Sequence, residues 1–218
     1  MSGGQVRPAI IVGVYNAGEF RMGEFTPPGM GDDPKKAKGD LYAKFLVEEL
    51  KPFIDARYRT LTDRANTGIA GSATGGLIAL YTAKAQHGTF GFVGLCSPWL
   101  RSPDGNKKLV PELGGDWLKQ TRFYIDMGTK GSGAGYPPFT DHTNASNPQA
   151  VLNALADGKD LVAALDSAGL QRGKDYVYEE VQGGEYNEPS WQGRVEPMLV
   201  FLLKPSGAPA TQPTASGQ

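Results

Sequence analysis

Short apolar runs bounded by turn-forming residues alternate along this chain with longer segments of helical periodicity. The apolar runs lie at residues 9–15, 67–70, 90–97, 123–126 and 175–181. Runs of about four to eight apolar residues are typical of strands buried on both faces, and the alternation in the last run also fits a strand. The pattern therefore predicts five strands, and residues 9–15 are expected to form a buried parallel strand.

Between these runs, apolar side chains recur at the spacing of an amphipathic helix. Such helices are predicted over residues 40–54, 77–85 and 191–203. A further helix opens at Asn147-Pro148, because Asn is a good cap and Pro fits the first helical position. Strands that alternate with helices predict an α/β fold, here a three-layer sandwich with a mostly parallel sheet.

The chain length of 218 residues fits one α/β domain, which we place at residues 1–204. Residues 205–218 contain only Pro, Gly, Ala, Ser, Thr and Gln, which cannot build a core, so we expect a disordered tail there. With 22 basic and 23 acidic residues, the formal net charge is −1. No overall field would therefore attract nucleic acid or an anionic membrane surface.

Signals for targeting, metals and cofactors are absent from the sequence. No stretch approaches the roughly 20 apolar residues of a membrane span, and residues 1–8 lack the regions of a signal peptide. The default expectation is a soluble cytoplasmic chain. Neither histidine belongs to a ligand-spaced cluster, so no metal or other cofactor is predicted. Cys96 lies in an apolar run, which favours a buried and inert thiol.

A glycine-rich turn follows the second predicted strand and precedes a helix. It reads Gly71-Ser72-Ala73-Thr74-Gly75-Gly76. Strand, tight glycine turn and helix are the setting of a nucleophile elbow, in which a central serine is lifted above the sheet edge. The central residue here is Ala73, and Ser72 lies one place early. The patterns of phosphate-binding and dinucleotide-binding loops also fail, since Leu77 and Ile78 follow the last glycine.

Several stretches around this turn agree with one enzyme family in the same order along the chain. They are Glu49–Asp55, Tyr58–Leu61, Gly68–Leu77 and Phe90–Pro98, with Ile10–Asn16, Arg21 and Glu24 upstream and Tyr124–Gly128, Glu188, Trp191 and Arg194 downstream. In these residues the chain resembles the putative-esterase family of α/β-hydrolases, which includes enterochelin-esterase-like proteins and relatives of feruloyl and acetylxylan esterases. The resemblance implies an α/β-hydrolase fold. Because the family's first strands precede the matched region, it also implies a sheet that lacks them and has one exposed side.

The same resemblance shows which catalytic positions are substituted. The family's nucleophilic serine falls on Ala73, its catalytic histidine on Tyr186 and its acid on Gly131. Without a hydroxyl or thiol at the elbow no acyl-enzyme can form, and without an imidazole there is no base tuned near neutral pH. Ser72 and His142 are the remaining candidates for a displaced catalytic pair.

Other polar residues near the predicted strand ends are candidates for binding a ligand. They are Arg21, Thr74, Asp126 and Glu188. Ligands of α/β sheets bind at the carboxyl ends of the strands, where these residues are expected.

Three functions follow as hypotheses. The leading one is a degenerate, non-hydrolytic member of the esterase family that keeps a cleft for a small ester or acylated sugar. The second is an active carboxylic-ester hydrolase with a displaced catalytic set. The third is an interaction module that pairs through an exposed sheet edge, for example as a homo-oligomer.

Overall fold

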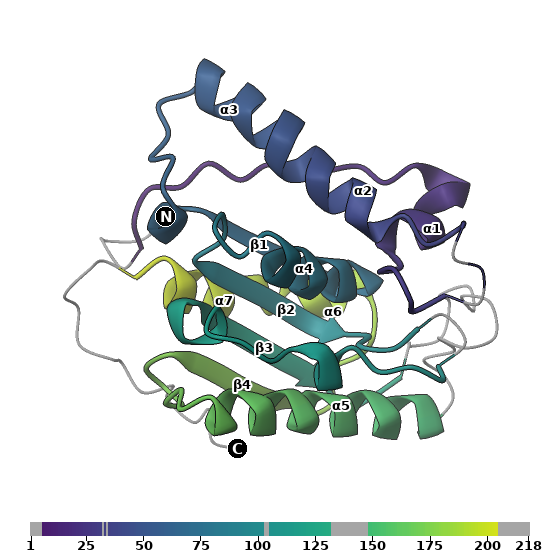
Figure 1. Cartoon of the computed structure of the whole chain (residues 1–218). Coiled ribbons are helices and arrows are strands. Elements are labelled where there is room, and N and C mark those ends of the chain that lie inside the picture. Colours follow the sequence, from purple (N-terminus) through teal and green to yellow (C-terminus); the bar gives the residue numbers. More distant parts are fainter. Residues whose placement is uncertain (1–5, 32, 34, 103–104, 132–147, 205–218) are drawn as a thin grey trace.

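A computed structural model describes residues 6–31, 33, 35–102, 105–131 and 148–204 (Figure 1). Four strands form one sheet in the order β1-β2-β3-β4, and every neighbouring pair is parallel. The strands are β1 (Gly68–Ala73), β2 (Phe92–Pro98), β3 (Arg122–Gly128) and β4 (Tyr176–Val181). The α/β class with a parallel sheet is thereby confirmed.

The helices flank this sheet and account for most of the remaining chain. They are α1 (Arg21–Phe25), α2 (Gly39–Lys44), α3 (Lys51–Arg57), α4 (Thr74–Ala85), α5 (Pro148–Ser167), α6 (Glu188–Gln192) and α7 (Val195–Leu202). A π-helical segment, Phe45–Leu50, joins α2 to α3, so the predicted helix at 40–54 runs continuously from 39 to 57. Short 3₁₀ turns occur at Gly18–Phe20, Arg64–Asn66, Val110–Glu112 and Leu118–Gln120.

Side chains of the central strands alternate between two apolar layers. Val93, Leu95 and Ile125 face one layer, in which α4 and α5 pack, whereas Tyr124 faces the other layer with Met198 of α7. Figure 1 shows α4 and α5 on the near side of the sheet and α6 and α7 behind it. Because successive residues of a strand point to opposite faces, each central strand contributes to both cores. This arrangement is the predicted three-layer sandwich.

The predicted strand at residues 9–15 is wrong. The segment is extended but belongs to no strand, and its large side chains are exposed, with Ile11 69% and Tyr15 98% accessible. Among the described residues, β1 pairs only with β2, so its outer edge and this segment both lack a strand partner. The apolar composition is typical of a buried strand, but burial also needs a neighbouring strand, which the described chain does not supply.

The predicted closing helix differs in detail from the structure, and the predicted tail is not tested by it. The predicted closing helix at 191–203 is two helices, α6 and α7, separated at Gly193 and Arg194, because the Arg194 side chain turns into the core. The expected tail at 205–218 lies outside the described residues.

Candidate functional site

The turn between β1 and α4 holds Ala73 in a conformation that side chains rarely adopt. Ala73 ends β1 and caps α4, with φ 53° and ψ −126°. A non-glycine residue at positive φ stores strain of about 1–3 kcal/mol, which surrounding contacts must offset. The geometry is that of a nucleophile elbow, yet the apex carries a methyl group.

Two glycines make the tight turn possible, and only one of them belongs to the G-x-S-x-G motif of a nucleophile elbow, which falls on Gly71 and Gly75. A Cβ on Gly71 would lie 2.2 Å from the Gly75 carbonyl oxygen, and a Cβ on Gly76 would lie 2.7 Å from the Pro98 Cβ. A Cβ on Gly75 would meet nothing within 4 Å. Gly71 and Gly76 are therefore required for packing, whereas Gly75, which the motif singles out, is not.

Arg21 lies beside the first turn of α4. Its Nη2 donates a hydrogen bond to the Thr74 hydroxyl at 3.1 Å, and its guanidinium lies 5.4 Å from the Phe25 ring centre. Thr74 is buried, while Glu24 accepts a hydrogen bond from the Ala17 N–H at 2.9 Å. The structure thus brings together two of the predicted ligand-binding residues, Arg21 and Thr74, next to the elbow.

The structure also brings together the positions that the resemblance assigns to the histidine and the acid. The Tyr186 N–H donates to the Gly131 carbonyl at 3.3 Å, and the Tyr186 ring packs edge-to-face on Trp191 at 5.2 Å. Tyr186 also packs against the apolar cluster that contains Ala73. Its hydroxyl is buried without a hydrogen-bond partner among the described residues, and burial raises the pKa of the phenol far above neutrality. Tyr186 can donate a hydrogen bond but cannot act as a base.

A buried polar cluster lies beneath these residues, between the sheet and α6. Arg194 Nη1 donates to Asp126 Oδ1 at 2.6 Å and to the Ser97 hydroxyl at 3.2 Å. The Gly128 N–H also donates to Ser97 Oγ, at 3.0 Å. Asp126 has no exposed surface, so this predicted ligand-binding residue is instead tied to Arg194 inside the core.

Burial and the nearby Arg194 charge have opposite effects on the pKa of Asp126. Desolvation raises the pKa of Asp126 to about 6, although the Arg194 guanidinium favours the ionised carboxylate. Burial, together with the Asp126 charge, raises the pKa of the neighbouring Cys96 thiol to about 12. Cys96 is therefore buried and inert as predicted, since a thiol needs its thiolate to react.

The remaining predicted residues lie apart from this cluster or outside the described chain. Glu188 is exposed at the start of α6, and Ser72 is partly buried in β1 opposite Cys96. His142 lies outside the described residues. Within those that are described, no group of three His, Cys, Asp or Glu side chains could hold a metal ion.

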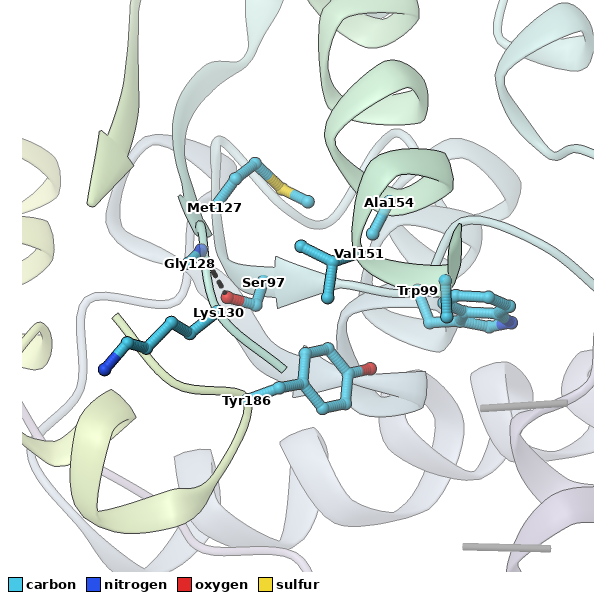
Figure 2. Close-up of a pocket in the computed structure, with 9 residues that line it drawn as sticks. Ser97, Trp99, Met127, Gly128, Lys130, Val151, Ala154 and Tyr186 are labelled. Atoms are coloured by element: carbon cyan, nitrogen blue, oxygen red, sulfur yellow. Dashed lines mark hydrogen bonds between the residues drawn. The ribbon is translucent and has the colours of Figure 1, made fainter. Parts of the chain in front are cut away.

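A pocket opens at the carboxyl ends of β2 and β3 (Figure 2). Its cavity volume is about 20 Å³. Its lining residues are Ser97, Trp99, Met127, Gly128, Lys130, Ala150, Val151, Ala154 and Tyr186. Figure 2 shows the Tyr186 ring opposite Val151, with its hydroxyl turned toward Trp99. The walls are mainly apolar, and Lys130 is the only charged residue among the described residues that line them.

An ion-pair cluster fixes two walls of this pocket. Arg101, which follows Trp99, donates from Nη2 to Asp157 of α5 at 2.9 Å and from Nε at 2.5 Å. Lys108 contacts the same carboxylate at 3.1 Å. Asp157 is fully buried, and a buried carboxylate is stable only with such partners. The segment after β2 is thereby held against α5.

With this geometry established, comparison with known proteins identifies the family. The model of the family described as "Putative esterase" matches residues 1–202. The chain therefore belongs to this esterase family of α/β-hydrolase proteins. A relative in Bacillus subtilis, the protein YjcH, is 24% identical over 201 residues, which cover 91% of this chain and 72% of YjcH.

Solved structures of esterases share the fold. A ferulic acid esterase superposes with a TM-score of 0.54 at 19% identity, over 74% of this chain and 60% of its own. Enterochelin esterase from Shigella flexneri superposes with a TM-score of 0.54 at 18% sequence identity, over 74% of this chain and 36% of its own. A ferulic acid esterase from Anaeromyces mucronatus superposes with a TM-score of 0.52 at 19% sequence identity, over 80% of this chain and 59% of its own. The chain thus spans less than two thirds of each of these structures, and at such identities the likeness shows the fold alone.

Sequence reasoning missed Ser97 and the role of Arg194. Ser97 has φ 43° and is buried, which no local pattern indicated. The spacing of Trp191 and Arg194 was part of the family resemblance, but nothing in it placed the guanidinium on Asp126.

None of the described helices is long and apolar enough to span a membrane.

Gly71 and Gly75 should respond differently to an added methyl group. Gly71→Ala should destabilise the protein by about 3 kcal/mol or more, because its Cβ would overlap backbone atoms that cannot move independently. Gly75→Ala is the matched control and should be neutral or stabilising by up to about 1 kcal/mol, since its Cβ enters open space in a helix. Urea unfolding of both variants measures the difference, and equal losses would contradict the packing argument.

The unfolding free energy of the protein should depend on pH through Asp126. A carboxyl whose pKa is raised on folding, from 3.8 to about 6, binds more protons in the folded than in the unfolded state between those values. The unfolding free energy should therefore fall as pH rises from 4 to 6, by up to about 3 kcal/mol for Asp126. Asp126→Asn should remove this slope in urea unfolding measured between pH 4 and 7. If the slopes of the two proteins coincide, Arg194 keeps Asp126 ionised throughout.

Proposed function

We propose that this protein is a non-hydrolytic member of the esterase family that binds an ester or acylated-sugar ligand without cleaving it. The observation that carries the proposal is the Ala73 methyl group at the apex of a turn with elbow geometry. The pocket beside Tyr186 is the proposed binding site.

The chemistry of the residues at the elbow argues against hydrolysis. Ester cleavage by this class needs a nucleophile at the apex and a base that accepts its proton. Ala73 has no lone pair, and the buried phenol of Tyr186 stays protonated at neutral pH. The nearby Ser97 hydroxyl is buried and accepts hydrogen bonds from both Gly128 and Arg194, which leaves it unsuited to attack a ligand.

Part of the chemistry needed to bind an ester is present in the walls of this pocket. The side chains of Trp99, Met127 and Val151 supply apolar walls, and ligand pockets are commonly apolar with a few polar groups. The Tyr186 hydroxyl, which has no hydrogen-bond partner among the described residues, could donate a hydrogen bond to an ester carbonyl. Such a site favours a bound ester that stays intact.

Restoring the missing groups tests the proposal. Wild type should bind methyl ferulate in calorimetry without turnover and should not react with a fluorophosphonate probe. Ala73→Ser alone should stay inactive, because the described residues place no base beside its hydroxyl. Ala73→Ser combined with Tyr186→His should hydrolyse aryl acetates about 100-fold faster than the single variant, which is within the usual range for general base catalysis.

The control for this experiment is Ser72→Ala, which should change nothing in the wild-type protein. Wild-type turnover or labelling that disappears in Ser72→Ala would instead establish an active hydrolase with a displaced nucleophile. Absence of methyl ferulate binding would contradict the proposed ligand class.

A second candidate function, an interaction module, is favoured by the exposed apolar surface. Most of the large exposed apolar side chains of the described residues lie in residues 10–61, and no described strand pairs with the outer edge of β1 beside this part of the fold. Exposed edges with apolar neighbours are sites of strand pairing. This surface supports pairing between two copies of the chain.

Light scattering with size exclusion tests this candidate. The wild type should be a dimer or larger, and Ile11→Lys should shift it toward the monomer, because Ile11 is 69% exposed in the unpaired segment. Leu152→Lys is the matched control, since Leu152 is 58% exposed on α5, away from this segment, and should not change the oligomer. A monomeric wild type would rule the candidate out.

A further inference from the structure

Three cationic residues meet at the amino-terminal end of the sheet, at the opposite end of the strands from the elbow. Arg122 begins β3, and its Nη2 donates to the Leu202 carbonyl at 2.8 Å. The Arg7 N–H donates to the next carbonyl, Leu203, also at 2.8 Å, and Lys204 follows. Figure 1 shows the start of the described chain beside the end of α7. These contacts place the three residues around the end of one helix.

The three side chains are partly buried and carry like charges. Desolvation and the charge of Arg7 lower the pKa of Arg122, and desolvation and the charge of Arg122 lower the pKa of Lys204. Each shift means that the environment disfavours the cation. Arg122 therefore lies within electrostatic range of both Arg7 and Lys204.

No carboxylate forms an ion pair with any of the three within the described chain. Asp175 is near enough to raise the pKa of Lys204, but its Oδ2 accepts a hydrogen bond from the Gln171 N–H at 2.9 Å. The adjoining sequences, residues 1–5 and 205–218, contain no Asp or Glu. Within the described chain, the Asp175 carboxylate therefore offsets only part of the charge of the three cations, and an excess of positive charge remains.

The end of α7 accounts for only part of this arrangement. A helix carboxyl end carries about half a negative charge, so one cation there is expected as a structural feature. Three cations carry more charge than one helix end can account for. In addition, Arg7 donates from Nη1 to Asn66, but its Nε is buried and has no hydrogen-bond partner among the described residues. A buried, unsatisfied charged donor is costly and indicates a missing acceptor.

We propose that Arg7, Arg122 and Lys204 form a binding site for a phosphate group, separate from the pocket beside the elbow. A tetrahedral dianion offers several acceptor oxygens to two guanidinium groups and an ammonium, and it would offset most of their mutual repulsion. The group is carried either by inorganic phosphate or by a phosphomonoester.

Thermal unfolding of the full chain in phosphate, with chloride at matched ionic strength as reference, tests the site. The midpoint should rise with phosphate concentration and saturate, because a ligand that binds only the folded state stabilises it. Arg122→Gln should weaken phosphate binding about tenfold, the effect of losing one charge-assisted hydrogen bond. Lys44→Gln removes an exposed lysine of α2 and is the matched control, which should keep the wild-type response.

A second measurement separates lost binding from damaged folding. In chloride alone, Arg122→Gln should unfold at a midpoint close to that of the wild type, because the loss of one repelling charge offsets the loss of the hydrogen bond to the Leu202 carbonyl. Comparing inorganic phosphate with glycerol phosphate identifies the source, and tighter binding of either supports the site. A phosphate response no larger than that of chloride, or one that is equal in Arg122→Gln and Lys44→Gln, would overturn the proposal.

Discussion

The close approach of β1, α4 and the end of β2 is the constraint on which the site depends. Gly71 and Gly76 let backbone and Pro98 come nearer than any Cβ would permit, and this contact holds Ala73 at positive φ. The strain in the turn persists because the contacts on both sides leave it no room to relax. The turn therefore keeps the geometry of an enzyme that needs it, although the side chain at its apex cannot use it.

Arg194 connects the layers beneath this turn. Its guanidinium reaches Asp126 of β3 and Ser97 at the end of β2, while its backbone separates α6 from α7. One buried cation thus orders two strand ends and the segment that carries Tyr186. The buried pair is costly to desolvate, and its value lies in fixing the positions of the pocket walls above it.

The sheet presents different chemistry at its two ends and at its free edge. Its carboxyl end holds an apolar pocket with a neutral phenol, which suits an uncharged ester group. Its amino end holds three cations with no acid paired to them among the described residues, which suits an anion. The edge of β1 exposes apolar surface in the neighbouring segment. The proposed loss of hydrolysis is compatible with such surfaces, because binding needs shape and charge but no reactive atom.

The sequence alone determined what depends on local pattern. Glycine spacing indicated the elbow, apolar runs indicated the four strands that form the sheet, and the residue at the apex, Ala73, could be read directly because a strand, a turn and a helix are local features. Tertiary structure decided what depends on neighbours distant in sequence. Residues 9–15 have a strand's composition but no partner strand, Asp126 is paired with Arg194, 68 residues away, and Gly76 replaces Gly75 as the tightly packed position. Burial and pairing are properties of two surfaces in contact, so a pattern along one segment cannot specify them.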